Sequence, residues 1–205
     1  DVYYYLSLYN ENYQHPPMPL GAQSGIIRGM YLLRSEENPK EAHVQLLGSG
    51  TILREVIAAA DLLKEEWGVT SDLWSVPSFT ELARDGQETE RWNLLHPQEQ
   101  PRQCYVQECL QGMTGPAIAS SDWTRAYAEQ IRPYMPMKFH VLGTDGFGRS
   151  DNRPALRDFF EIDRRWIVVK ALKALADQGQ VPAERVQQAI KIMGIKAERP
   201  APWKV

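Results

Sequence analysis

From residue 43 onward, short continuous apolar runs alternate with longer segments in which apolar residues recur at helical spacing. The run HVQLLGSG, residues 43–50, predicts a buried strand, and TILREVIAAADLLKEEWG behind it predicts a helix that ends at Gly68. SDLWSVPSF, GPAIASSDW and KFHVLGTDGFG begin further units of this kind. Strands that alternate with helices are typical of a parallel sheet. The pattern therefore predicts an open, mostly parallel α/β domain over residues 41–205, with helices on both faces of the sheet.

Both ends of the chain depart from this alternation. The tail predicts two helices, in DRRWIVVKALKALADQG and PAERVQQAIKIMG, each with one apolar face. At the other end, the β-forming residues of VYYYLSLY predict a strand over residues 2–9. The chain enters this strand at once from Asp1, without a methionine, which indicates a piece of a longer protein. Prolines at 16, 17 and 19 exclude a regular helix and predict a connector over residues 10–40 with a short strand at 29–34.

Polar residues before the predicted helices are candidate caps, because their side chains accept hydrogen bonds from the first free N–H groups. Ser78 or Thr80 is placed to cap the second helix of the α/β region, and Asp122 the third. Asp151 or Asn152 is placed to cap the helix that follows KFHVLGTDGFG. Each cap sets the residue at which the chain leaves the sheet and turns into a helix.

Composition places the chain among ordinary globular proteins. Apolar residues make up 43% of its 205 residues and charged residues 24%, and the formal net charge is −3. This balance argues against a general nucleic-acid binder, which needs a basic face to neutralise phosphates. No apolar run is long enough for a membrane span and no leader is recognisable, so we expect a cytoplasmic protein without membrane contact. Cys104 and Cys109 are too far apart for a C-x-x-C pair and are expected to be free thiols.

Two glycine-rich turns are candidates for a phosphate-binding loop. GSG, residues 48–50, lies between a strand and a helix, but the third glycine of a dinucleotide fingerprint is replaced by Leu53, which favours a structural turn. GTDGFGRSD, residues 143–151, fits neither that spacing nor a P-loop, and Asp145 would repel a phosphate. We interpret it as a strand-to-helix turn whose Asp151 caps the helix. These residues either pack the loop or have a function, and the function that we consider is contact across a dimer through Asp145, Phe147 and Arg149.

The four histidines show no metal-binding pattern. Their spacings are unrelated, and none pairs with another at metal-ligand distance in the sequence. We expect them to be surface or hydrogen-bonded structural residues, with catalysis by a single histidine as the alternative. They are His15, His43, His96 and His140.

Several longer runs resemble those of homodimeric pyruvate dehydrogenases, the thiamine-dependent first components of pyruvate dehydrogenase complexes. They are LYNENYQHPPMP, GMYLLR, VQLLGSGTILREV, SVPSFTELARDGQETERWNLLHP and VLGTDGFGRSDNRPALRDFFEID. The resemblance implies a transketolase-like enzyme of three α/β domains. Residues 1–40 would be the last strand of the middle domain and a connector, and residues 41–205 the transketolase-like C-terminal domain.

The resemblance also implies an activity. The full protein would decarboxylate pyruvate on thiamine diphosphate with magnesium and transfer the acetyl group to a lipoyl-bearing acetyltransferase. The family's diphosphate and magnesium ligands, its activating acid and its active-site histidines precede the residues present here. We therefore expect no catalytic, cofactor-binding or metal-binding residue in this chain, which would be inactive alone.

One comparison within the resemblance concerns the substrate. In transketolases the strand that corresponds to residues 2–9 ends in Ser-Arg-Gln-Asn, whose arginine holds a sugar phosphate. Asn10 aligns with that arginine, and pyruvate has no phosphate, so loss of a fixed cation fits. Asn10 and Glu11 are thus candidates for residues near the substrate. The alternative is that Asn10 only caps a turn.

Two hypotheses follow from the sequence. The first is a C-terminal domain of a pyruvate dehydrogenase that serves dimer assembly and active-site architecture. The second is a free-standing interaction or effector-binding module of the same fold. A sheet whose first strand is paired within the chain would favour the second.

Overall fold

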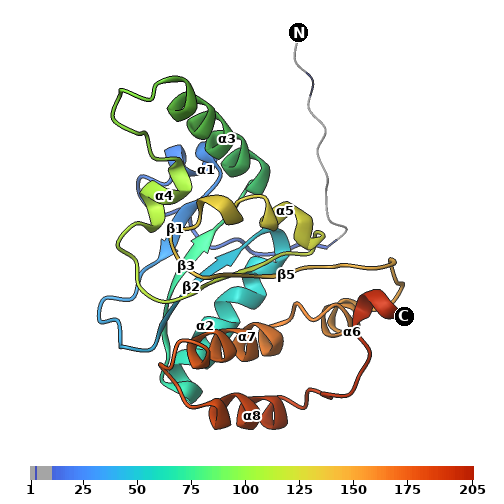
Figure 1. Cartoon of the computed structure of the whole chain (residues 1–205). Helices are drawn as coiled ribbons and strands as arrows, with labels where there is room; N and C mark the ends of the chain where they lie inside the picture. The colour runs from blue at the N-terminus through green and yellow to red at the C-terminus, as the bar shows by residue number, and fades with distance from the viewer. Residues whose placement is uncertain (1–2, 4–10) are drawn as a thin grey trace.

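The centre of the fold is a five-stranded sheet, found in a computed structural model that describes residue 3 and residues 11–205 (Figure 1). In the described residues the strand order is β1-β3-β2-β4-β5. Strand β1 is antiparallel to β3, and all other neighbours are parallel. The predicted open, mostly parallel sheet is therefore confirmed. The strands are β1 (Tyr31–Arg34), β2 (His43–Gly48), β3 (Thr70–Ser75), β4 (Ala117–Ser120) and β5 (Phe139–Leu142).

Helices cover both faces of this sheet, as predicted (Figure 1). One face is covered by α2 (Leu53–Trp67) and α7 (Arg164–Ala176), with α8 (Ala183–Ile192) packed against α7. The other is covered by α1 (Gln23–Arg28), α3 (Phe79–Leu95), α4 (Tyr105–Leu110) and α5 (Arg125–Glu129). The described part of the chain also contains α6 (Arg153–Phe159) and three 3₁₀ helices, η1 (Gly50–Ile52), η2 (Arg132–Tyr134) and η3 (Pro202–Lys204).

Side-chain alternation along the strands creates two cores. In β2, Val44 and Leu46 point into the core under α2, α7 and α8, whereas Leu47 points into the core under α3 and α4. In β4, Ile118 and Ala119 divide in the same way. Successive side chains of a strand lie on opposite faces, so a strand covered on both faces buries all its side chains, and most of those that enter the two cores are apolar. This is the physical reason for the continuous apolar runs in the sequence.

The ends of the helices test the predicted caps. Ser78 caps α3, because its side chain accepts from the backbone N–H of Glu81, and Gly68 ends α2 in the left-handed conformation, with φ of 64°. The prediction that Asp122 caps the helix after β4 was wrong. That helix, α5, begins after Thr124, and the N–H of Arg125 donates to Asp145 instead. A carboxylate from a later loop has taken the capping role.

The cap of α6 also differs from the interpretation of the loop. Asn152, not Asp151, accepts from the N–H of Ala155, and Asp151 accepts from the N–H of Asn152.

Two elements of the first forty residues were predicted incompletely. Helix α1 follows the prolines, and β1 is shorter than the predicted strand because Gly29 adopts a φ of 103° and ends α1. The predicted strand over residues 2–9 lies outside the described residues.

A buried polar network lies where β2 and β3 begin. His43 contacts Thr70 through Nδ1 at 2.8 Å and Asp72 through Nε2 at 2.9 Å. The other oxygen of Asp72 accepts from the hydroxyl of Ser35, at 3.0 Å, and from the N–H of Glu36, at 2.9 Å. The network binds the loop between β1 and β2 to the amino-terminal ends of β2 and β3. His43 is thus the hydrogen-bonded structural histidine that was expected.

Candidate functional site at the carboxyl edge of the sheet

The carboxyl ends of the parallel strands lie level with one another. Gly48 of β2 is the ladder partner of Ser75 in β3 and Ser120 in β4, and Ser120 is the partner of Leu142 in β5. Ligands of open α/β sheets bind in the crevice outside this edge, which makes it the place to look for a site. A cavity of about 150 Å³ lies here, lined by Thr51, Asp122, Thr144, Arg153, Arg157, Phe160 and three aliphatic residues.

Three of the polar residues that line this cavity bind one another. The hydroxyl of Thr51 donates to a carboxylate oxygen of Asp122 at 3.4 Å, and that of Thr144 donates to the carbonyl oxygen of Asp122 at 2.8 Å. Thr51 follows β2, Asp122 follows β4 and Thr144 follows β5. The three strand ends are thereby joined to one another around the cavity.

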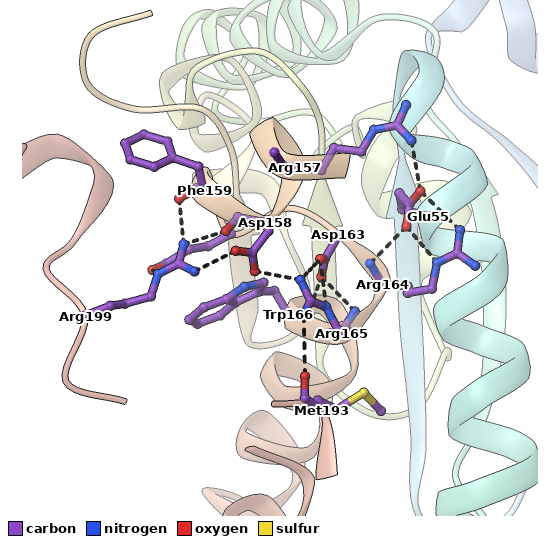
Figure 2. A network of polar contacts seen from close by, with 12 residues as sticks. Glu55, Arg157, Asp158, Phe159, Asp163, Arg164, Arg165, Trp166, Met193 and Arg199 are labelled. Carbon is purple, nitrogen blue, oxygen red and sulfur yellow. Dashed lines mark hydrogen bonds and ion pairs between the residues drawn. The ribbon is translucent and has the colours of Figure 1, made fainter. Parts of the chain in front are cut away.

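Glu55 carries the buried charge of the site (Figure 2). Its residue is only 5% exposed, and its carboxylate accepts from Arg157 of α6 at 3.0 Å and from Nε of Arg164 of α7 at 2.8 Å. Burial by itself raises the pKa of this carboxyl, but the hydrogen bonds and charge of Arg164, with the charge of Arg157, outweigh it and lower the pKa. Glu55 is therefore an ionised link between α2, α6 and α7, and its partners occupy both of its oxygens.

A second set of ion pairs continues from this link toward the tail (Figure 2). Asp163 caps α7 by accepting from the N–H groups of Arg165 and Trp166, and it also accepts from the Arg165 guanidinium. That guanidinium donates at 2.6 Å to Asp158 of α6, which accepts from Arg199 at 3.1 Å. The tail after α8 is thus bound to the end of α6.

The connector reaches the same edge. Glu11 forms an ion pair with Arg153, which lines the cavity, and Glu11 also accepts from the hydroxyl of Tyr13 at 2.7 Å. The guanidinium of Arg54, at the start of α2, lies 4.6 Å from the centre of the Tyr13 ring. Of the two substrate-proximal candidates, Glu11 is thus at the rim of the cavity. Asn10 lies outside the described residues.

The loop over residues 143–151 is packed against its own chain. A Cβ on Gly143 would lie 2.7 Å from the carbonyl oxygen of Trp123. Gly146 has a φ of 105°, and a Cβ there would lie 3.0 Å from the backbone of Pro202 and Trp203. The glycines therefore serve close backbone approach, with the tail covering the loop.

The three dimer-contact candidates in this loop have different surroundings. Asp145 forms an ion pair with Arg125 and accepts from its N–H at 3.0 Å, so its carboxylate is engaged within the chain. Arg149 lies 5.3 Å from the centre of the Phe159 ring. Phe147 is 84% exposed. Contact across a dimer stays a prediction for all three; Phe147 and Arg149 are both exposed, whereas Asp145 is half-buried.

The first glycine-rich turn is a strand-to-helix turn, as predicted. Gly50 begins η1 and Leu53 begins α2. A Cβ on Gly48 would lie 2.8 Å from the Cα of Leu53, so the helix packs where a phosphate would enter. The turn at residues 48–50 is therefore filled, whereas the later turn is packed at Gly143 and Gly146 and open at Gly148.

The described residues contain neither a metal-binding group nor a membrane-spanning helix. Within them, no group of three or more histidine, cysteine, aspartate or glutamate side chains is arranged to hold a metal ion. Because α2 fills the turn at residues 48–50 and the described residues contain no such metal-binding group, they do not fit a site for thiamine diphosphate and its magnesium ion. No helix in the described part of the chain has the length and apolar character that crossing a bilayer requires. Cys104 is buried and Cys109 half-buried, and both are free thiols.

Comparison with known proteins identifies the domain. The family described as transketolase-like TK C-terminal domain matches residues 29–163. The chain belongs to this family. The transketolase of Leishmania mexicana shares the fold, with a TM-score of 0.51 and 20% identity over 78% of this chain and 20% of that one. The division of this transketolase-like chain at residue 40 stays a prediction, although β1 joins the same sheet.

The relatives of this transketolase-like domain agree with the resemblance found in the sequence. The chain is 58% identical to the pyruvate dehydrogenase E1 component of Cupriavidus necator, over 100% of its own length and 23% of that protein. It is 58% identical to the E1 component of Pseudomonas aeruginosa and 50% identical to that of Escherichia coli K12, over 98% of the chain in each case. It spans 23% and 22% of their lengths.

Two features of the site were missed in the sequence. Glu55 occupies the apolar face of its helix, three residues after Ile52 and four before Ala59. A carboxylate that is buried on an apolar face needs a cationic partner, so its position in the helix could have indicated a buried ion pair. The pairing of Glu11 with Arg153 had no such signal, because both are ordinary surface residue types far apart in the chain.

Proposed function

We propose that this chain is the C-terminal domain of a thiamine-diphosphate-dependent pyruvate dehydrogenase that uses magnesium. The whole enzyme would decarboxylate pyruvate and pass the acetyl group to the lipoyl group of an acetyltransferase. The observation that carries the proposal is the 58% identity to pyruvate dehydrogenase E1 components over the full chain. Because the chain spans about a quarter of such proteins, the domain is one part of that enzyme.

Within the enzyme, we assign the domain a supporting role in dimer assembly and active-site architecture. Two observations support this role. At its carboxyl edge, the hydroxyls of Thr51 and Thr144 both donate to Asp122, which joins strand ends within the domain. The accessible Phe147 lies in the loop after β5, where an exposed aromatic side chain suits a protein interface.

The proposal is tested with the full-length protein and with a version that lacks residues 41–205. Carbon dioxide release from pyruvate is measured with thiamine diphosphate and magnesium, together with acetyl transfer to a lipoyl domain. We expect activity only in the full-length protein. An isolated chain of residues 1–205 that decarboxylates pyruvate would overturn the supporting role, and a full-length protein without activity on pyruvate would overturn the assignment.

The dimer contact is tested separately. In the full-length protein, Phe147→Asp is expected to weaken the dimer in analytical ultracentrifugation, because it places a charge in an apolar contact. Leu94→Asp on α3 is the matched control, since Leu94 is 77% exposed and lies outside this loop. If Phe147→Asp and Arg149→Ala leave both dimerisation and activity unchanged, the loop has no role between subunits.

A further inference from the structure

Four side chains join the connector to the α/β domain, and we call them the connector clasp: Glu11, Tyr13, Arg54 and Arg153. Glu11 is bound from two sides, by the ion pair with Arg153 and by the Tyr13 hydroxyl at 2.7 Å. The Tyr13 ring lies under two guanidinium groups, 4.6 Å from Arg54 and 6.0 Å from Arg153. Cations over an aromatic face are attracted by its quadrupole. Each member of the clasp thus contacts at least one other.

The clasp lies where the chain enters the domain. Arg54 is the second residue of α2 and Arg153 the first of α6, and these helices follow β2 and β5 at the carboxyl edge. Residues 11–19 contain no helix or strand. A segment without regular structure has no backbone ladder to hold it, so its side-chain contacts set its position.

Helix α6 presents Arg153 from a fixed support. Arg157, one turn further along α6, donates to the buried Glu55 at 3.0 Å, and Asp158 accepts from Arg165 at 2.6 Å (Figure 2). The far end of this short helix is therefore bound to α2 and α7. Arg153 is placed by the core of the domain, and the connector is placed by Arg153.

The charges favour the ion pair at neutral pH. The hydrogen bond from Tyr13 lowers the pKa of the Glu11 carboxyl, and the charge and hydrogen bond of Arg153 lower it further. Both side chains are substantially exposed, at 50% for Glu11 and 34% for Arg153. Exposed ion pairs add little to the free energy of unfolding. The main effect of this pair is therefore to hold the connector in one position.

We propose that Glu11 and Arg153 are a positioning pair that sets the orientation of the α/β domain relative to the polypeptide joined to it through the connector. The inference rests on the proposed function, in which that polypeptide contains the reacting groups. Small misplacements of reacting groups cost large factors in rate, so loss of the pair lowers turnover without unfolding the domain. Neither residue contacts substrate in this proposal.

The test uses the full-length enzyme with Glu11→Arg, Arg153→Glu and the charge-swapped double variant. We expect each single variant to lower kcat/KM for pyruvate roughly tenfold, mostly in kcat, with an unchanged melting temperature. The double variant is expected to recover most of the loss, because the pair is restored in reverse. A structural pair of similar exposure, Arg34–Asp61, is swapped in the same way as the control and is expected to change neither kinetic constant.

A second readout is independent of activity. Amide hydrogen exchange over residues 11–22 is expected to speed up in Arg153→Glu and to return to the wild-type rate in the double variant. Wild-type kinetics in both single variants, or a double variant no better than either, overturns the positioning role. A wild-type enzyme without pyruvate activity overturns the proposed function, and the exchange rates then still decide whether the clasp holds the connector.

Discussion

The carboxylate of Glu55 accepts from Arg164 through both the backbone N–H, at 3.1 Å, and the guanidinium, at 2.8 and 3.2 Å. These two residues are 109 positions apart and join the start of α2 to the start of α7. The same carboxylate also accepts from Arg157 of α6 at 3.0 Å. It therefore supports both the core and the helix that carries Arg153.

Removal of this carboxylate is expected to be costly. Glu55→Ala should lower the free energy of unfolding by about 3 kcal/mol, because it leaves two arginines without their buried partner. Urea denaturation measures the change. The matched control is Glu81→Ala, which removes an exposed ion pair with Arg84 and should cost less than about 1 kcal/mol. Equal losses in the two variants would contradict the importance of the buried contact.

Asp72 makes the stability of the domain sensitive to acid. Burial by itself raises the pKa of this carboxyl, but hydrogen bonds from Gln45, the N–H of Glu36 and the ring of His43 outweigh it and hold the pKa below its ordinary value of 3.8. Because the folded pKa is the lower one, the stabilising contribution is present above pH 3.8 and is lost as the pH falls through the lowered pKa.

Asp72→Asn should remove this dependence. We expect it to destabilise the domain at neutral pH by about 2 kcal/mol, since a buried network loses its charged acceptor. Its unfolding free energy should then change less than that of the wild type between neutral pH and about pH 3. Urea denaturation across this range gives both values. Parallel pH curves for the two proteins would show that Asp72 is not the group responsible.

Two glycines of the loop after β5 are expected to respond differently to substitution. Gly146→Ala should destabilise by about 1–2 kcal/mol, because its φ of 105° strains an L-residue and its Cβ would press on Pro202 and Trp203. Gly148→Ala is the matched control, since nothing lies within 4 Å of a Cβ there. Thermal unfolding measures both, and the fluorescence of Trp203 reports release of the tail. If Gly146→Ala leaves the melting temperature unchanged, the tail does not pack on the loop.

The α/β fold was predictable because its signals are local. The apolar runs at residues 43–48 and 117–120 are short, buried on both faces and followed by helical periodicity, so each segment indicates its own structure. Short elements were less predictable. Helix α4 has only six residues, and packing rather than propensity decides whether so short a helix forms.

The candidate site was only partly predictable. Ser78 was recognised as a cap because it acts three residues away from Glu81, within one turn. Asp122 was assigned the wrong role because the group that caps α5, Asp145, comes from a loop 20 residues further along. A cap that comes from a distant loop has no fixed spacing from the helix, so the sequence does not reveal it.

The sequence by itself determined the class of fold, the two apolar faces of the sheet and the family, because these depend on residue type and local order. Only the tertiary structure decided which charges meet. Glu55 with Arg164, and Glu11 with Arg153, are separated by more than a hundred residues, and each carboxylate could have paired with many arginines. The choice follows from the strand order and from helices that converge on one edge of the sheet, which fixes distances that no local pattern encodes.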